Sequence, residues 1–513
     1  MVTAVALVVY GVLLAAAAFA VWRRPLLALY LWIVGLAVHN AVGAALYGAG
    51  VHGSPLTAIL AWKEILLAVA LARVGLDVIR TRRLPFRPHA VDALALAYGL
   101  LVCIYALIPQ HVLGGAADRH AVALALKHDL VPVAAYLLGR ALVVRRGQLV
   151  SVAWTIVGAA AVVAAWGVID DYAISISWWR DSAVVPYFHK QLGYDYNGTG
   201  GLPENFIYNT GSELHFLRRL VAVFLSPLAT AYMLVVALLL AAALRRRPRL
   251  LAVLSAVAAA GLLLTFSRSS LIALAAGLVA FAFAGRRIWP LPAAAVTVAV
   301  FVAWAHAFPH VAPQGRWTHE DLVKQRQIAH QHPGASGSAV STSEPSIREH
   351  LTSLRDGAST VIHHPQGYGL GNAGQTASRT GTPIKAGESN YTEMGAETGV
   401  LGSLLWTAWT VALFVALLRA ARRTRWWPTV AAASAFGAAL VLAVQTDVIG
   451  DPWMAYVLWA LGGITLVAPE RAPSVSKMDT RAFSLRDVLV PRVLALSRVR
   501  SGRSARRRER SRL

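Results

Sequence analysis

Long apolar segments, separated by short polar junctions, run through almost the whole chain. A helix needs roughly 20 apolar residues to cross the hydrocarbon core of a bilayer. Hydrophobic residues make up 57% of the sequence and charged residues 14%, whereas an average soluble domain is about 25% charged. The sequence therefore excludes a soluble enzyme and predicts an all-α, polytopic transmembrane bundle of about 12–13 helices. The candidate segments are about 2–22, 26–46, 55–78, 91–108, 121–143, 149–168, 217–244, 250–265, 270–284, 289–308, 397–419, 427–447 and 453–468.

Clusters of arginine fall at every second junction between these segments. Basic residues next to transmembrane helices are enriched on the cytoplasmic side, so one threading of the chain satisfies all the clusters. It places the N-terminus outside and the C-terminus inside. The formal charge of +23 is thus explained by topology, with membrane lipid as the partner and no nucleic acid. The clusters are Arg23-Arg24, 80–83, Arg145-Arg146, 245–249, Arg286-Arg287, 422–425 and the tail after Arg471.

This threading divides the chain into six parts and leaves two long external loops. N-terminal transmembrane helices (1–168) precede the first external loop (169–216), and further helices with a hairpin tip at Arg268 (217–308) precede the second (309–396). The second loop lacks apolar periodicity over most of its length, which predicts short helices and irregular structure. C-terminal transmembrane helices (397–468) and a basic cytoplasmic tail (469–513) complete the chain. Within the tail, Phe483 to Val499 is either a basic amphipathic helix on anionic lipid or unstructured.

Three arginines on the predicted external side run against the charge bias. Arg219 opens the predicted helix 217–244, next to Arg218, and Arg268 lies at a tight hairpin tip beside Ser267 and Ser269. The planar guanidinium group suits bidentate contact with phosphate oxygens. The alternative is that these side chains extend to lipid headgroups. We expect a phosphate-binding role for Arg219 and Arg268.

Charged residues also occur inside two predicted helices. Lys63-Glu64 lies early in the third segment, and Lys127, His128 and Asp129 lie within the fifth. A charge at membrane depth costs at least ~2.5–3.5 kcal/mol on insertion scales and usually faces a bundle interior or a cavity. These residues are therefore either internal ion pairs or part of a substrate path.

The segment 346–402 combines a helix, a glycine-rich turn and a polar entry into the next span. Arg348 and Arg355 are seven residues apart and share one face of an amphipathic helix. The sequence HHPQGYGLGNAG comes next, and such a turn lets backbone N–H groups approach an anion. After it, ESNYTEMGAETGVLG leads directly into the span 397–419.

The order of these features resembles the O-antigen ligase/O-antigen polymerase family of envelope glycan enzymes. Four motifs carry the resemblance, which extends over about 217–447. They are Arg219 after the first long loop, the T-x-S-R tip ending at Arg268, the run from Arg348 through His364 to Gly371, and the E-x-G-x-x-G signature at Glu397. The family pattern has a His-Asn pair about nine residues before the glutamate, and here that position is Glu388 followed by Ser389. Ligase and polymerase therefore both remain open.

The resemblance implies a GT-C-like glycosyltransferase of the bacterial cytoplasmic membrane, with its active site on the external face. Such enzymes transfer a glycan from a polyprenyl diphosphate to a sugar hydroxyl of a glycan or glycolipid acceptor, with no cofactor, nucleotide sugar or metal. Carried onto this sequence, Arg219, Arg268 and Arg348 would stabilise the leaving diphosphate. Glu388 would act as general base. The residues expected to bind substrate are Arg355, His364, Gly369, Asn390 and Glu397.

Other functions stay open. His363 and His364 are alternative bases or simply shape the turn. A transporter or flippase of a lipid-linked saccharide would use the long loops as gates, although such proteins typically show internal repeats, and we find none in the sequence. A metal-dependent transferase would use the acidic pair Asp170-Asp171, which otherwise only solvates a helix end.

Overall fold

The computed structural model describes residues 1–194, 202–203, 205–209, 212, 214–244, 247–331, 345–387 and 389–471. The chain divides into a compact unit, Met1–Glu470, and a second unit, Arg471–Leu513. The predicted amphipathic helix of the tail lies outside the described residues.

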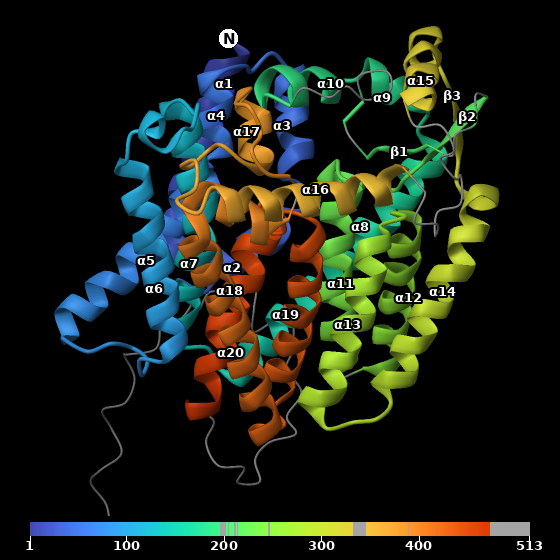
Figure 1. Ribbon diagram of the computed structural model, residues 1–513. Coiled ribbons are helices and arrows are strands. Elements are labelled where there is room, and N and C mark those ends of the chain that lie inside the picture. The colour runs from blue at the N-terminus through green and yellow to red at the C-terminus, as the bar shows by residue number, and fades with distance from the viewer. Residues whose placement is uncertain are drawn as a thin grey trace, which may run out of the picture. The chain divides into compact units, whose positions relative to one another are not determined.

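The first unit is a bundle of membrane-spanning helices (Figure 1). Eight described helices are long and apolar enough to cross a bilayer, and two bent pairs raise the number to as many as ten. Three shorter apolar helices accompany them. Each predicted segment overlaps one of these helices or pairs, which confirms the polytopic helical membrane protein.

The spanning helices and the shorter apolar helices have well-defined bounds. The eight are α1 (Val2–Arg23), α6 (Ala90–Leu107), α7 (Arg119–Ala141), α8 (Arg146–Ala173), α13 (Arg268–Gly285), α14 (Pro290–Val311), α18 (Asn390–Thr424) and α19 (Trp427–Gln445). The bent pairs are α2 (Leu27–Gly35) with α3 (His39–Gly48), and α4 (Ser54–Leu60) with α5 (Trp62–Thr81). The shorter ones are α11 (Pro227–Ala243), α12 (Pro248–Leu264) and Met454–Leu466, which joins η5 (Met454–Leu458) to α20 (Trp459–Arg471).

Small residues let the central helices approach closely. A Cβ added at Gly437 of α19 would lie 2.9 Å from the Ala280 Cβ of α13, and one at Gly277 would lie 3.1 Å from the Ser434 carbonyl oxygen. Helices in lipid gain little from burying apolar surface against each other, so close backbone packing replaces the hydrophobic effect. This contact fixes α13, which begins at Arg268, against α19, which leads to Asp447.

The structure corrects the predicted start of the seventh segment. The helix α11 begins at Pro227, where the Ser226 side chain accepts a hydrogen bond from the Ala229 N–H. Upstream, β2 (His215–Arg218) pairs antiparallel with β1 (Ile207–Tyr208) and with β3 (Gln314–Arg316). The expectation that Arg219 opens a helix is therefore wrong, because that residue follows a strand.

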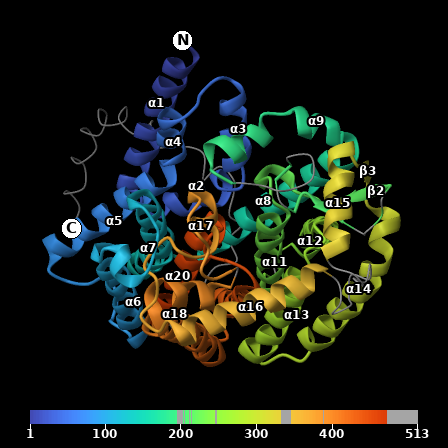
Figure 2. The same cartoon turned by 45° about the horizontal axis from the view of Figure 1, so that its top comes forward.

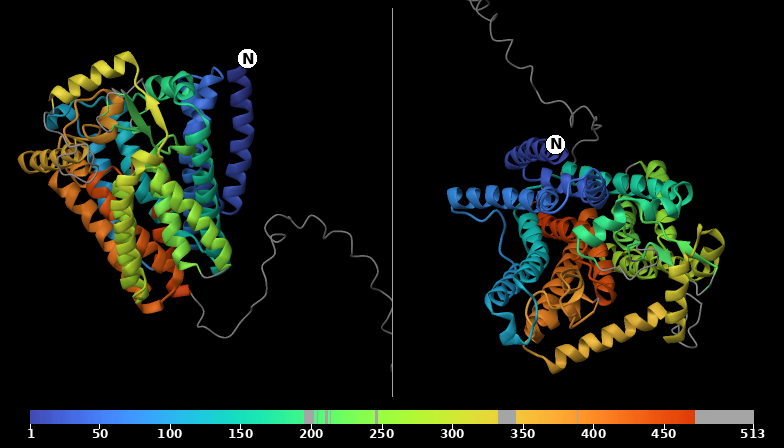
Figure 3. Two further views of the ribbon diagram at one scale, coloured as in Figure 1. Left: turned by 90° about the vertical axis from the view of Figure 1, so that its right-hand side faces the viewer. Right: turned by 90° about the horizontal axis from the view of Figure 1, so that it is seen from above.

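Short elements cover one end of the bundle. They are η1 (Gln110–Leu113), α9 (Ile176–Asp181), α10 (Val184–Pro186), η2 (Tyr187–Gln191), η4 (Ala222–Phe224), α15 (His319–Gln331), α16 (Pro345–His363) and α17 (Gly374–Thr380). In Figures 1 and 2, α16 lies across the ends of the spanning helices, and Figure 3 shows it along one side of the bundle seen from above. The expectation of short helices in the second loop agrees with this arrangement.

One face of α16 packs against α18. Added Cβ atoms at Gly357 and at Gly395 would lie 2.8 Å from the Thr392 Oγ1 and 2.5 Å from the Val361 Cγ2, respectively. By helical geometry, Arg348 is turned about 140–180° away from this packed face, and it is exposed.

Candidate functional site

A break inside α18 organises the site. Thr398 and Gly399 leave the helical conformation, and Gly399 has φ +73° and ψ −176°. A Cβ at Gly399 would collide with the Pro365 carbonyl oxygen, so only glycine suits both the backbone angle and the close approach. The Val400 N–H donates to the same Pro365 oxygen at 2.9 Å. The glycine-rich turn is therefore bound to the break in α18.

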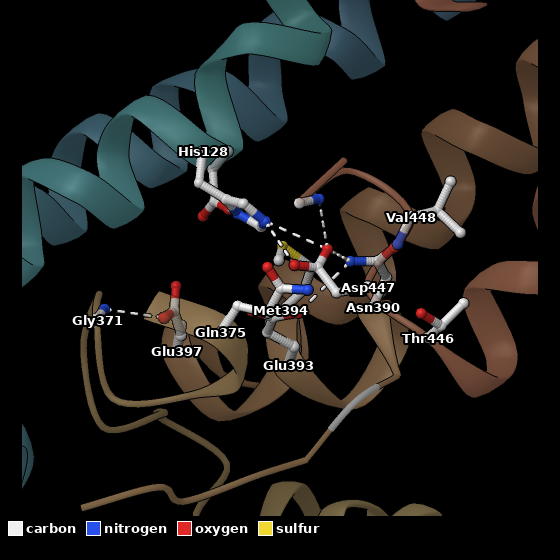
Figure 4. Close-up of polar contacts among 12 residues, drawn as sticks. His128, Gly371, Gln375, Asn390, Glu393, Met394, Glu397, Thr446, Asp447 and Val448 are labelled. Atoms are coloured by element: carbon white, nitrogen blue, oxygen red, sulfur yellow. Dashed lines mark hydrogen bonds and ion pairs between the residues drawn. The ribbon is translucent and has the colours of Figure 1, made fainter. Parts of the chain in front are cut away.

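The glycine-rich turn binds the side chain of Glu397 in this structure. The buried Glu397 carboxylate accepts a 2.8 Å hydrogen bond from the Gly371 N–H (Figure 4). The Glu397 carbonyl oxygen accepts a second bond from the Gly369 N–H at 2.9 Å. The turn and the glutamate of the E-x-G-x-x-G signature thus satisfy each other, and Glu397 holds the turn in place.

A buried polar cluster lies next to this turn, where α7, α18 and the segment after α19 meet (Figure 4). His128 bridges two carboxylates: its Nδ1 lies 2.8 Å from Asp129 Oδ1 and its Nε2 lies 3.0 Å from Asp447 Oδ2. The Asn390 amide donates to Asp447 Oδ1 at 2.7 Å. Burial disfavours the charge of Asp447, but the charge and hydrogen bond of His128, with those of Asn390 and Gly450, outweigh it and hold the pKa of Asp447 below its usual value.

Glu393 completes this cluster, which we name the carboxylate cluster: His128, Asp129, Asn390, Glu393 and Asp447. The Glu393 side chain is buried, and the Asn390 amide approaches its Oε2 at 3.5 Å. One ligand atom each from His128, Glu393 and Asp447 lie within 4.8 Å of one another, a set able to hold a metal ion. The His128–Asp447 ion pair accounts for the approach of two of these groups, and Asn390 contacts both Asp447 and Glu393.

Two arginines form a cationic group at the tip of the α12–α13 hairpin. Arg219 is 9% exposed; its Nε donates to the Thr265 carbonyl oxygen at 2.9 Å and its Nη1 to Asn205 Oδ1 at 3.3 Å. Burial and, after it, the positive charge of Arg268 lower the pKa of Arg219 to about 9. Arg268 is the first residue of α13, and its guanidinium lies 5.9 Å from the centre of the Tyr208 ring. We call Arg219 and Arg268 the arginine pair.

The hairpin tip that positions Arg268 is tightly built. Only three residues separate α12 from α13, and Phe266 among them takes a positive φ of 48°. Its ring stacks on Phe308 at 4.0 Å between centroids, which offsets part of the cost of that conformation. The Ser267 and Ser270 hydroxyls lie 2.7 Å apart and are buried. The packing and hydrogen bonds of the T-x-S-R tip therefore hold the Arg268 guanidinium in a fixed position.

Two hydroxyl groups connect the arginine pair to the carboxylate cluster. The Tyr232 hydroxyl lies 3.0 Å from the Thr446 hydroxyl, and Thr446 directly precedes Asp447. Tyr232 is also close enough to Arg219 to act on its charge. The two groups thus adjoin across α11 and the segment after α19, so a substrate with an anionic and a hydroxyl end has matching partners on each side.

The other predicted site residues are placed differently. Glu388, the predicted base, lies outside the described residues. Arg348 and Arg355 are exposed on the face of α16 that points away from α18. His364 stacks on Tyr368 at 3.8 Å, and its Nε2 lies 3.0 Å from the Leu113 carbonyl oxygen.

Gly369 and the acidic pair Asp170-Asp171 each have a structural role. A Cβ on Gly369, at φ +92°, would collide with the Gln110 side chain, so this glycine allows close packing. The acidic pair Asp170-Asp171 faces Arg218, whose guanidinium lies 3.7 Å and 3.4 Å from the two carboxylates. The contact with Arg218 therefore explains why these two carboxylates lie together.

Sequence reasoning missed Asp447 and Glu393. Asp447 lies at the end of an apolar segment, where a single carboxylate is typical of a helix end. Glu393 lies inside a motif whose spacing singles out Glu388 and Glu397 instead. Their shared signal is that each is an acid at the margin of a predicted span, where charge is costly.

Fold and site define a polytopic helical membrane protein with buried charges gathered near one end of the bundle. The family model described as O-antigen ligase matches residues 253–407. The match runs from α12 into α18 and includes Arg268, the glycine-rich turn and Glu397. It confirms the family resemblance, and the family implies a glycosyltransferase that uses lipid-linked glycans. No curated protein matches the sequence.

Proposed function

We propose that this protein transfers a glycan from a polyprenyl diphosphate to a sugar hydroxyl at the external face of the bacterial cytoplasmic membrane. The observation that carries the proposal is the arginine pair next to the carboxylate cluster in a chain that the O-antigen ligase family model matches over residues 253–407. Breaking a glycosyl–diphosphate bond needs fixed positive charge at the leaving group and a proton acceptor at the attacking hydroxyl. The arginine pair offers the first function, and the second falls to Glu388, two residues before Asn390 of the carboxylate cluster.

In this proposal Arg219 and Arg268 bind the diphosphate, and Arg348, exposed on the face of α16 that points away from α18, joins them through a movement of α16 when donor is bound. Glu388 takes the proton of the acceptor hydroxyl as that oxygen attacks the anomeric carbon, and the diphosphate leaves with the bonding electron pair. Asn390, two residues later in the sequence, donates a hydrogen bond to Asp447. Glu397 and Gly369 shape the adjacent turn, and Arg355 and His364 line the entrance for the glycan.

The test is transfer of a labelled lipid-linked glycan by the purified chain in nanodiscs. Arg268→Ala and Glu388→Gln are expected to abolish product, and Arg268→Lys to leave activity well below wild type, since an ammonium group lacks the bidentate fork. Removing one such donor costs about 3–4 kcal/mol in the transition state, or roughly 10²–10³ in rate, by analogy with oxyanion holes. Wild-type product from both Arg268→Ala and Glu388→Gln, at equal protein level, would refute these roles.

A transporter of a lipid-linked saccharide is the second candidate, and the two bent spans favour it. Broken helices are typical of transporters, and the pairs α2/α3 and α4/α5 are bent by 61° and 46°. Movement of a fluorescent lipid-linked glycan across vesicles, without any covalent product, would support transport and contradict transfer.

A further inference from the structure

A second group of basic side chains lies where the two bent spans break. Lys63, in the first turn of α5, is 8% exposed. Its ammonium lies 3.1 Å from His39 Nε2, at the start of α3, and donates to the Leu60 carbonyl oxygen at 3.0 Å. The breaks in both spans thus meet at this lysine.

The charges around Lys63 do not balance. Glu64 Oε1 lies 3.5 Å from Lys63 Nζ and 3.4 Å from Lys127 Nζ. Arg379 of α17, which packs against α7, is close enough for its charge to act on Lys63. Among the described residues, Glu64 is thus shared between Lys63 and Lys127, and Arg379 adds a further positive charge near Lys63. We name Lys63, Lys127 and Arg379 the lysine cluster.

The backbone adds to this positive charge. The second half of each bent span begins at the break, with α3 starting at His39 and α5 at Trp62. The N-terminal end of a helix carries a partial positive charge, and half-helix N-termini in membrane proteins commonly face anionic groups. Broken backbone at membrane depth is tolerated where it is buried in protein or lines a cavity. Side chains and helix ends therefore both favour an oxyanion at this place.

Sequence neighbours and side-chain contacts link the lysine cluster to the arginine pair. Lys127 precedes His128 in α7, and His128 reaches Asp447. From Asp447 the link continues through Thr446 and Tyr232 toward Arg219. The carboxylate cluster is thus linked to both cationic groups, through Lys127 beside His128 and through Thr446 and Tyr232.

We propose that the lysine cluster is a second oxyanion site, which holds a phosphate group of the acceptor while the arginine pair holds the donor diphosphate. This rests on the proposed glycan transfer and adds the class of acceptor: a glycolipid that bears phosphate. The acceptor hydroxyl then lies over the carboxylates between the two sites.

The experiment counts binding sites for inorganic pyrophosphate on the full chain in phosphatidylcholine nanodiscs, by titration calorimetry. Wild type is expected to bind two pyrophosphates. The triple variant Lys63→Met/Glu64→Gln/Lys127→Gln, which leaves no carboxylate unpaired, is expected to lose one site by at least about tenfold in affinity. Arg268→Ala is expected to weaken the other by a similar factor. Two intact sites in the triple variant would overturn the proposal, as would a single wild-type site that Arg268→Ala weakens.

A matched control and a second lipid composition sharpen the result. Arg73→Gln removes a cation from the same helix, where it pairs with Asp77, and is expected to keep both sites. With phosphatidylglycerol added to the discs, a persistent second site supports an acceptor phosphate, whereas its loss assigns the lysine cluster to phospholipid headgroups and overturns the proposal. Binding only at the lysine cluster, with none lost in Arg268→Ala, would instead refute the arginine pair of the proposed function.

Discussion

The Asn390 side chain makes two hydrogen bonds that tie the first turn of α18 to the segment after α19. Its amide donates to Asp447 Oδ1 at 2.7 Å, and its carbonyl oxygen accepts from the Val448 N–H at 2.8 Å. On its other side, Asp447 faces His128 of α7. Three elements far apart in the sequence thus converge on one carboxylate, so changes at this point are expected to act on the whole site.

Asp447 and His128 are expected to behave as a coupled pair. His128→Gln leaves two buried carboxylates without their cation, and breaking such a pair costs about 3–5 kcal/mol. Asp447→Asn in the same chain removes one of those charges, so the double variant is expected to regain part of the lost stability. Thermal unfolding in detergent measures the cycle, with the exposed-pair variant Asp77→Asn as control, which is expected to cost about 0.3–0.5 kcal/mol. Additive losses from His128→Gln and Asp447→Asn would contradict the coupling.

Gly399 is expected to tolerate no side chain. Gly399→Ala meets both a positive φ and the nearby Pro365 carbonyl oxygen, so it should detach the glycine-rich turn and lower stability by at least about 1–3 kcal/mol. Gly158→Ala is the control, because nothing lies within 4 Å of its added Cβ in the middle of α8, and alanine is the better helix former there. Equal melting temperatures for the two variants would show that the break in α18 is not fixed by Gly399.

The fold could be predicted because each span carries its own signal. About 20 apolar residues suffice to identify a transmembrane helix, and all thirteen segments overlap an apolar helix or bent pair. The start of α11 could not be predicted this way. Residues 219–226 have the apolar composition of a transmembrane helix, yet they follow the strand β2 and precede the helix. Backbone hydrogen bonds decide the conformation at the start of this segment. The Leu220 N–H donates to the Leu264 carbonyl oxygen, and the Arg219 N–H donates to that of Phe206.

The site could be predicted only where a motif is local. Arg219 and Arg268 could be predicted because each is a basic residue on the predicted external side, against the usual enrichment of basic residues on the cytoplasmic side. The motif identifies Glu397, but its role as the anchor of Gly371 depends on a fold of the turn that spacing does not give. The approach of His128 to Asp447 joins positions 319 residues apart, and no local pattern specifies it.

Asp451 is expected to make stability depend on pH. Burial raises its pKa to about 7, although the Met454 and Trp453 N–H groups oppose this. Its unfolded pKa is about 3.9, so between these values the folded chain holds a proton that the unfolded chain has lost. The stabilising contribution is full below about pH 4 and is lost as pH rises through about 7. Asp451→Asn should flatten the fall in melting temperature over that window and melt higher than wild type above pH 7. An unchanged slope would exclude Asp451 as its source.

The arginine pair is expected to give pyrophosphate binding an alkaline limit. The Arg219 guanidinium must be protonated to bind an anion, and its pKa lies at about 9 because of burial and then of Arg268. Binding at this site should therefore be full at neutral pH and weaken as pH rises through about 9. In Arg268→Ala the neighbouring positive charge is gone, so the pKa of Arg219 rises; the residual binding should be weaker at neutral pH but should persist to higher pH. Calorimetric titrations from pH 7 to 10, on the triple lysine-cluster variant so that one site remains, measure both effects. A limit that does not move in Arg268→Ala would show that the two guanidinium groups are not coupled, and would remove the electrostatic basis for treating them as one site.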